Sequence, residues 1–421
     1  MDKPITTVLT RNLKDTITDR LVEEPVIILN GARTVGKSTL LKQCADLFNV
    51  SAVDLDDLET REAVKNDPSL FAAGPEPICI DEFQHILPLL DAIKAQLNKD
   101  MRPGRSILTG STRYATLPHS SQSLTGCAHI LTIWPLSQGE LRGKRETFFE
   151  TLVKDPSKFV TPKLATTNRL EYESMVLAGG FPLALARATD QSRHRWFQDY
   201  VTMVIERDVL ELRKVRQHQV LPEILRYLAA QTGQLHKSAS IATSMSLDKN
   251  TVADYIQLLE SVFLIHRLEA FGRTLSSRIN RSPKVHLVDT GLAAHLLGIT
   301  TAKLANRDPS ALSEFGHLLE TFAVNEILKQ ASWSSTPARF SHFRTKDGYK
   351  VDLICEIENS RIFGIEVKAS ATLYNSDFKG LQLLRDKLGD NFLGGIILHL
   401  GTHSYTKEDR LYAIPLDRIW N

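Results

Sequence analysis

The most constraining feature of this chain is the segment from Gly31 to Ser38, which reads Gly-Ala-Arg-Thr-Val-Gly-Lys-Ser. An apolar run of strand length, residues 25–30, precedes it, and a segment of helical pattern, residues 38–43, follows it. The glycines allow the backbone to curl so that successive N–H groups point at phosphate oxygens, and the start of the helix adds a partial positive charge. The sequence therefore predicts a loop that holds the phosphates of a nucleotide.

Each residue of this loop has an expected role. Lys37 is expected to reach the β- and γ-phosphates, and the Ser38 hydroxyl to bind Mg²⁺. A chance glycine-rich turn is the alternative, but the strand, the Lys-Ser pair and the helix follow in the required order. The expected nucleotide-binding residues are Gly31, Ala32, Arg33, Thr34, Val35, Gly36, Lys37, Ser38 and Thr39.

Two further strands end in polar residues. The apolar run 77–80 is followed by Asp81 and Glu82. Asp81 is expected to hold Mg²⁺ through its water shell, and Glu82 to orient and deprotonate the attacking water. The run 107–108 leads into Thr109 and Ser111, either of which could sense the γ-phosphate; a polar turn after a core strand is the open alternative. These residues together predict an enzyme that hydrolyses ATP with Mg²⁺ as cofactor.

Length and composition set the limits of the whole chain. A chain of 421 residues is too long for one ordinary core, so several domains are expected. The 51 basic and 49 acidic residues nearly cancel, so any basic surface must be local. No apolar run approaches the roughly 18 residues needed to cross a bilayer, and the four cysteines form no close pair. We therefore expect a cytoplasmic protein with reduced thiols and no membrane partner.

The pattern along the chain predicts an α/β protein with four parts. Residues 1–150 alternate strands with helices around a parallel sheet, and residues 151–232 read as a helical lid and connector. Residues 233–295 read as a winged helix-turn-helix, and residues 296–421 as a linker followed by a second α/β domain. The strands expected in the first part are 26–29, 52–55, 78–80, 106–109 and 129–133.

The third part has the features of a nucleic-acid-binding module. Two short helices are separated by a tight turn, with Lys249 and Asn250 at the start of the second. A basic segment follows and would form the wing, where clustered cations gain by releasing counterions from DNA. Packing within the chain, or binding to protein, is the open alternative. The basic residues of this segment are Arg273, Arg278, Arg281 and Lys284.

The last part carries a second chemical signal. Asp352 lies on a strand that follows an Asp347-Gly348 turn, and Glu366 and Lys368 lie two residues apart on the next strand, so that they share one face. Two carboxylates and an ammonium suit a Mg²⁺-dependent phosphodiesterase, in which Asp352 and Glu366 bind the metal and Lys368 positions or activates water. A salt-bridged strand pair is the alternative.

The first part resembles the AAA-like ATPases of bacteria and archaea that are related to archaeal initiator and STAND-type ATPases. The loop with its Arg33, the Ile80-Asp81-Glu82 run and Leu108-Thr109-Gly110-Ser111 carry the resemblance. It implies that Gly180 and Pro182, in Gly-Gly-Phe-Pro, pack near the nucleotide. Where the family usually has arginine, this chain has Cys127, which leaves the source of an arginine finger open. The unranked candidates are Arg113, Arg142, Arg145 and Arg207.

The last part resembles the PD-(D/E)xK nuclease fold. The resemblance implies that Glu320, on a helix, joins Asp352, Glu366 and Lys368 in catalysis, and Gln382 matches an accessory position more weakly. Over nearly the whole chain, the sequence resembles a family that joins an AAA-like ATPase to a C-terminal domain of unknown function with a winged helix and this nuclease-like fold. The segments 200–208 and 288–292 also match that family.

Two functional hypotheses follow. In the first, ATP binding and hydrolysis control a DNA-directed, nuclease-like C-terminal domain. In the second, the protein is an ATP-regulated scaffold whose nuclease-like fold is inactive, in defence or toxin–antitoxin control. DNA, a partner protein and a second copy of the chain are the expected partners beside ATP.

Overall fold

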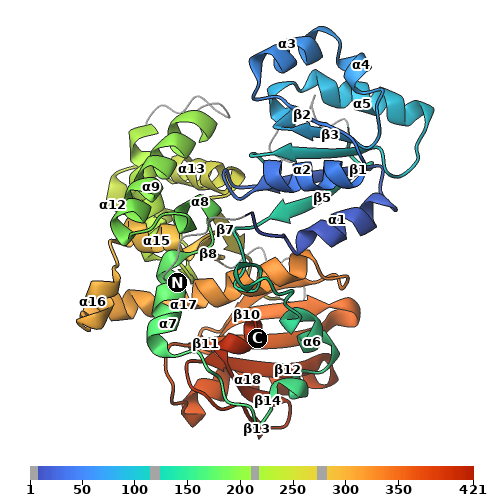
Figure 1. Cartoon of the computed structure of the whole chain (residues 1–421). Helices are drawn as coiled ribbons and strands as arrows, with labels where there is room; N and C mark the ends of the chain where they lie inside the picture. The colour runs from blue at the N-terminus through green and yellow to red at the C-terminus, as the bar shows by residue number, and fades with distance from the viewer. Residues whose placement is uncertain (1–7, 114–123, 210–217, 273–281) are drawn as a thin grey trace.

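The computed structural model describes residues 8–113, 124–209, 218–272 and 282–421. Three parts can be distinguished in Figure 1: an N-terminal α/β part, a largely helical middle part, and a C-terminal part built on a second large sheet. Arg273, Arg278 and Arg281 of the predicted wing lie outside the described residues.

The N-terminal part contains, among the described residues, a five-stranded sheet in the order β2-β3-β4-β1-β5, in which all pairs are parallel. The strands β1, β3 and β4 are buried on both faces, which explains why their sequences are almost continuously apolar. All five predicted strands are confirmed. Their bounds are β1 Val26–Gly31, β2 Ala52–Asp54, β3 Ile78–Asp81, β4 Ser106–Gly110 and β5 Ala128–Ile133.

Helices cover both faces of this sheet. Alternate residues of β1 point to opposite faces, so Ile27 and Leu29 pack with one set of helices while Val26 and Ile28 pack with the other. On the first face lie α1 (Leu13–Leu21) and α2 (Lys37–Leu47), and on the second face lie α3 (Leu58–Asn66), α4 (Pro68–Phe71) and α5 (Pro88–Lys99).

The middle part surrounds a small antiparallel sheet, β6-β8-β7. Two of its helices, α12 and α13, lie where the sequence predicted the helix pair, and Asp248 caps α13 through the N–H groups of Asn250 and Thr251. The elements are α7 Arg169–Ala178, α8 Pro182–Leu185, α9 Asp190–Met203, α11 Leu221–Ala230, β6 Gln234–Leu235, α12 Ser238–Met245, α13 Lys249–Ser261, β7 Ile265–Leu268, β8 Lys284–Leu287, α15 Thr290–Leu297 and α16 Thr301–Ala305.

The C-terminal part contains, in the described ranges, a six-stranded mixed sheet in the order β13-β14-β12-β11-β10-β9. The helix α18 (Lys379–Leu388) packs on one face and α17 (Pro309–Ser332) on the other. The strands are β9 Arg339–Arg344, β10 Lys350–Ile357, β11 Arg361–Lys368, β12 Phe392–His399, β13 Tyr405–Glu408 and β14 Leu411–Pro415.

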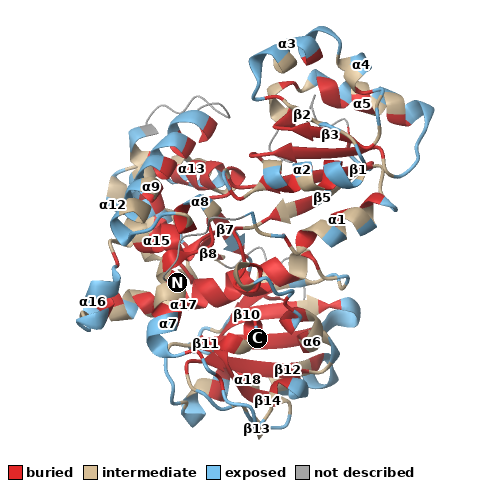
Figure 2. Cartoon of the chain, in the orientation of Figure 1, coloured by how far each residue is buried: buried red, intermediate tan, exposed pale blue. Residues whose placement is uncertain are grey.

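The three parts are more interwoven than the sequence suggested. The segment 296–315, predicted as a linker, contains α16 and the first turns of α17. At the end of the predicted N-terminal part, α6 (Phe148–Lys154) packs against α17 and the C-terminal part. The long α17 is buried over most of its length (Figure 2). No helix in the described ranges is long and apolar enough to span a bilayer, and all four cysteines are buried with free thiols.

Gly180 provides a test of this close packing. A Cβ atom at Gly180 would lie 2.3 Å from the carbonyl oxygen of Leu136, so the backbone would have to shift. Gly316, within α17, has no atom within 4 Å of its Cβ position among those described.

We therefore expect Gly180→Ala to lower the melting temperature markedly, by an overpacking cost of about 1–3 kcal/mol. Gly316→Ala should leave it unchanged or raise it, because alanine favours the helix by about 1 kcal/mol. Thermal unfolding followed by circular dichroism would compare the two variants. Equal melting temperatures would contradict the packing described for Gly180.

Candidate functional site

The loop between β1 and α2 has the backbone form of a phosphate cradle. Gly36 has a φ of 97° and Thr34 a φ of 61°, and α2 begins directly afterwards at Lys37. At the other end of the loop, a Cβ at Gly31 would lie 2.4 Å from the carbonyl oxygen of Ile133 on β5. Both glycines are thus required by the local geometry, one by its positive φ and one by the close approach of β5.

Lys37 lies beneath this loop. Its side chain is only 4% exposed, and Nζ donates hydrogen bonds to the carbonyl oxygens of Gly31 and Ala32, at 3.1 and 2.9 Å. Burial lowers the pKa of Lys37, and the nearby carboxylate of Glu82 opposes this effect. The ammonium is held within the loop by neutral carbonyl groups, which phosphate oxygens could replace.

Asp81 ends β3 at the same edge of the sheet. The side chains of Ser38 and Thr109 both hydrogen-bond its carboxylate. Burial raises the pKa of Asp81, whereas these two hydrogen bonds lower it. A hydroxyl and a carboxylate in contact suit Mg²⁺, which usually takes one or two protein oxygen ligands together with phosphates and waters. Ser38 and Asp81 would therefore hold the metal.

Glu82 follows Asp81 with a φ of 53°, an uncommon conformation for a residue with a side chain. This conformation directs its carboxylate towards β4, where the Ser111 hydroxyl donates to Oε2 at 3.1 Å. The Gln84 amide also donates to Oε2, and to the Ser111 oxygen at 3.1 Å. The β4 strand pairs with both β1 and β3, so it brings Ser111 and Thr109 beside the two acids.

Arg33 ties the loop to the middle part. Its Nε donates to both carboxylate oxygens of Asp208, at 2.7 and 2.6 Å. Although burial lowers the pKa of Arg33, its bond to Asp208 outweighs this and raises it. The Tyr200 hydroxyl donates to the carbonyl oxygen of Arg33 at 3.4 Å. Tyr200 lies in the last turn of α9 and Asp208 in a short π-helical stretch, Val204–Val209, so the segment 200–208 supports the loop through these two side chains.

Arg11 is a supporting residue that the sequence analysis missed. Its guanidinium donates to the carbonyl oxygens of Val35 and Trp134, both at 2.7 Å, and to Glu140 at 3.0 Å. It thereby fixes the loop to the segment after β5. No local pattern could have revealed it, because its partners lie 24 to 129 residues away.

The other predicted residues contact groups outside the loop. The N–H of Gly180 donates a hydrogen bond to Asp289 at 2.6 Å. Cys127 is buried, and its Sγ accepts a hydrogen bond from Lys94 at 2.9 Å. Among the arginine-finger candidates, Arg207 lies 3.5 Å from Asp56, which follows β2 and also contacts His85. Arg142 contacts Gln138 and the Trp420 ring, and Arg145 pairs with Asp15.

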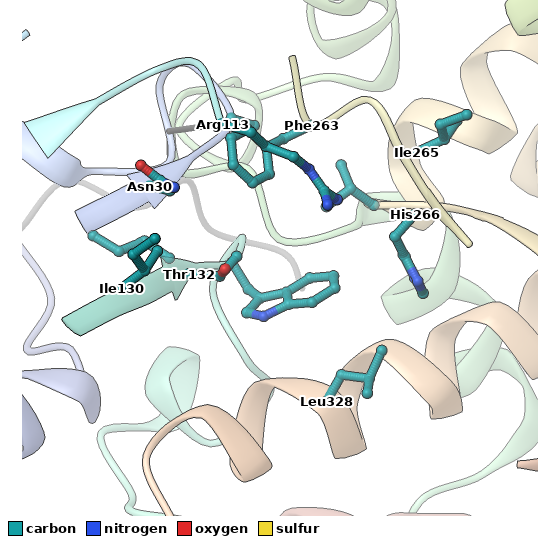
Figure 3. Close-up of a pocket in the computed structure, with 12 residues that line it drawn as sticks. Asn30, Arg113, Ile130, Thr132, Phe263, Ile265, His266 and Leu328 are labelled. Carbon is teal, nitrogen blue, oxygen red and sulfur yellow. The ribbon is translucent and has the colours of Figure 1, made fainter. Parts of the chain in front are cut away.

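Arg113 bridges the carboxyl edge of the N-terminal sheet and the middle part. Following β4, its backbone N–H donates to the carbonyl oxygen of Ser261 at 3.1 Å, and its Nε donates to that of Glu260 at 3.0 Å. Its guanidinium lies 5.1 Å from the centre of the Phe263 ring. Arg113 and Phe263 line a cavity of about 280 Å³, which Asn30 of β1 and Thr132 of β5 also line (Figure 3).

The structure also brings the predicted acidic residues together, from α17, β10 and β11. The carboxylates of Glu320, Asp352 and Glu366 are buried. Lys350 Nζ lies 3.1 Å from Asp352 and 3.2 Å from Glu366. Lys368 Nζ lies 3.2 Å from Glu366 and 3.4 Å from Asp377.

Lys284 is the main correction to the sequence analysis. It was expected on an exposed basic wing, but it is 3% exposed, and its Nζ lies 2.5 Å from Glu320 and 2.9 Å from Asp352. Gln382 likewise differs from its expected accessory position, because its amide donates to Glu408 at 2.8 Å on the exposed side of α18. Sequence spacing could not reveal the Lys284 contacts, since its partners lie 36 and 68 residues away.

The lysines control the charge state of the cluster. Burial raises the pKa of Glu320 to about 8 and that of Glu366 to about 7. Burial alone would also raise the pKa of Asp352, but Lys284 and Lys350 hold it well below its usual value. With this arrangement the described residues form no group of three or more His, Cys, Asp or Glu side chains able to hold a metal ion. The cluster as it stands does not fit a divalent cation.

Comparison with known proteins agrees with a nucleotide-binding site in the N-terminal part. Residues 23–142 match the family described as AAA domain. The N-terminal part is therefore an AAA-family P-loop domain, which implies nucleotide binding, typically with Mg²⁺. Residues 169–303 match the domain of unknown function DUF8612, and residues 315–419 match the domain of unknown function DUF4143.

Relatives extend over most of the chain. An uncharacterized protein of Mycobacterium tuberculosis is 26% identical over 399 residues, which cover 94% of this chain and 81% of that protein. One of Haemophilus influenzae is 22% identical over 371 residues, covering 82% and 80%. Among solved structures, the RuvB Holliday junction branch migration motor of Thermotoga maritima matches with a TM-score of 0.31 and 14% identity, over 62% of this chain and 90% of that chain.

The Arg33–Asp208 pair gives a test of how the loop is supported. We expect Asp208→Asn to weaken binding of a fluorescent ATP analogue roughly threefold to tenfold, because a neutral hydrogen bond replaces a charged one and the difference between the two is about 1 kcal/mol. Asp199→Asn, the same change at an exposed position of α9, serves as the control. Equal affinities for the two variants would show that Asp208 does not support the loop.

Proposed function

We propose that this protein binds ATP with Mg²⁺ and hydrolyses it at the carboxyl edge of the N-terminal sheet, and that its nucleotide state controls the C-terminal part. One observation carries the proposal: Lys37, Asp81, Glu82 and Ser111 converge at this edge from α2, β3 and β4. Ligands of open α/β sheets bind at the carboxyl ends of the strands. The AAA-domain match to residues 23–142 supports the same location.

The roles of the side chains follow from their contacts. Lys37 would exchange its bonds to loop carbonyls for bonds to the β- and γ-phosphates. Ser38 and Asp81 would hold Mg²⁺, which neutralises charge that develops on the phosphates. Glu82 would orient the attacking water and accept its proton, since Ser111 and Gln84 already fix its carboxylate. Ser111 and Thr109 would sense the γ-phosphate.

Arg113 offers a route by which this site controls the rest of the chain. It lies two residues after Ser111, and its bonds to Glu260 and Ser261 attach the sensor strand to the end of α13. Beside these bonds lies the cavity of Figure 3. Closely packed interfaces move as units, so a shift of β4 on nucleotide binding would pass to α13 through Arg113.

We further propose that the middle part is a winged helix directed at DNA. Lys249 and Asn250 are exposed at the start of α13, where a recognition helix presents its first turn. The burial of Lys284 removes one cation from the predicted wing. The alternative function is that of an ATP-regulated scaffold with an inactive nuclease-like fold, and the lysine-paired acids of the C-terminal cluster favour it.

Glu82→Gln tests the ATPase proposal. The variant should bind ATP with unchanged affinity, because the amide keeps the shape of the side chain, while turnover should fall by roughly 10²–10⁴-fold with loss of the general base. Phosphate release and binding of a fluorescent ATP analogue would measure the two effects. Glu62→Gln, at an exposed position of α3, is the control, and unchanged turnover in Glu82→Gln would refute the assignment.

Arg113→Ala tests the coupling. In the wild type, a non-hydrolysable ATP analogue should change amide hydrogen exchange in residues 249–261, and in Arg113→Ala this change should shrink while ATP affinity is kept. Arg267→Ala is a matched control, because Arg267 also pairs with Glu260, at 2.7 Å, but lies on β7 within the middle part. An undiminished response in Arg113→Ala would contradict this route.

A further inference from the structure

The acidic cluster is assembled from elements that belong to different parts of the chain. Glu320 lies on α17, Asp352 on β10 and Glu366 on β11, whereas Lys284 reaches them from β8 of the middle part. The Nζ atom of Lys284 lies between two carboxylates, 2.5 Å from Glu320 and 2.9 Å from Asp352. An ammonium group in this position supplies the charge that a bound cation would supply.

The carboxylates of this cluster are shielded from water. Asp352 is fully buried, and its second oxygen accepts from the Val367 N–H at 3.1 Å. Oε2 of Glu366 is buried and has no hydrogen-bond partner in the part of the chain that the structure describes. Buried acceptors without partners are rare in folded proteins. One carboxylate oxygen of the cluster thus receives no hydrogen bond from the described residues.

We propose that Lys284 is an internal cation that closes the acidic cluster, and that removing its ammonium opens a site for one divalent metal ion on Glu320 and Asp352, the two carboxylates that it contacts. Carboxylate oxygens are the ligands that Mg²⁺ and Mn²⁺ prefer. An unpaired buried carboxylate is strongly unfavourable, so a cation should replace the lost ammonium.

Lys284 is also placed where it can respond to the rest of the molecule. It is paired in register with Leu268 of β7, and β7 follows α13 after a short turn. The end of α13 is held by Arg113. A movement of this small sheet relative to α17 would withdraw the ammonium from the acids. That ATP causes such a movement rests on the proposed function, whereas the closure of the cluster by Lys284 does not rest on it.

The experiment measures Mn²⁺ binding without nucleotide, by calorimetry and by the electron paramagnetic resonance signal of free Mn²⁺. Lys284→Ala and Lys284→Gln should each gain one Mn²⁺ site, at least roughly tenfold tighter than any site of the wild type, because the ion replaces a buried charge. Lys284→Arg keeps the charge and should gain none. The double variant Lys284→Ala/Asp352→Asn should lose the gained site, which places the ion in the cluster.

Several results would overturn the proposal. One is equal Mn²⁺ binding by the wild type and the folded neutral variants, and another is a tight wild-type site that Asp352→Asn abolishes. If the neutral variants unfold, millimolar Mn²⁺ should restore their circular dichroism, and failure to do so would also count against it. Loss of ATP turnover in Glu82→Gln is measured separately, so the two proposals can fail independently.

Discussion

The buried polar side chains of α17 are the constraint on which the arrangement of the three parts depends. A buried polar group without a partner costs about 1–3 kcal/mol, so each of these side chains fixes the element that it contacts. Along the helix, the first of these side chains bond to β8 and the residue after it, the next to the segment after β5, and the last to the C-terminal residues. The side chains are Glu320, Asn325, Glu326, Lys329 and Gln330.

This helix explains why the two charged sites differ in character. At the nucleotide site, Lys37 is held by neutral carbonyl groups and the acids by hydroxyl groups and an amide, so a ligand can displace these weak partners. In the C-terminal cluster each acid is paired with an ammonium in a buried setting. Exchange there requires an element to move, because buried ion pairs are costly to break from one side.

The sequence predicted the local structure of the N-terminal part well. The five parallel strands and the positions of Lys37, Asp81 and Glu82 follow from apolar runs and spacing, because these features depend on neighbours in the chain. The roles given to the individual site residues remain predictions. The contacts of Arg11, Asp208 and Lys284 could not be predicted, since each joins segments that only the complete fold brings together.

The burial of Lys284, which was predicted on a basic wing, has the same explanation. Lys284 resembles the basic residues around it in sequence, and nothing in its neighbourhood signals burial. Its environment is set by α17 and β10, which lie far along the chain. Charge clustering in the sequence therefore could not reveal that the partners of Lys284 are two distant acids.

The position of Lys284 has a practical consequence for cutting this protein into separate domains. The matched regions 169–303 and 315–419 suggest two separable pieces, yet the ammonium belongs to the first and its carboxylates to the second. A fragment containing only the second would expose the apolar surface of α17 and carry buried acids without their counter-charge. The cooperative unit of folding thus crosses the boundary that sequence comparison draws, and the C-terminal sheet takes its electrostatic balance from a strand outside it.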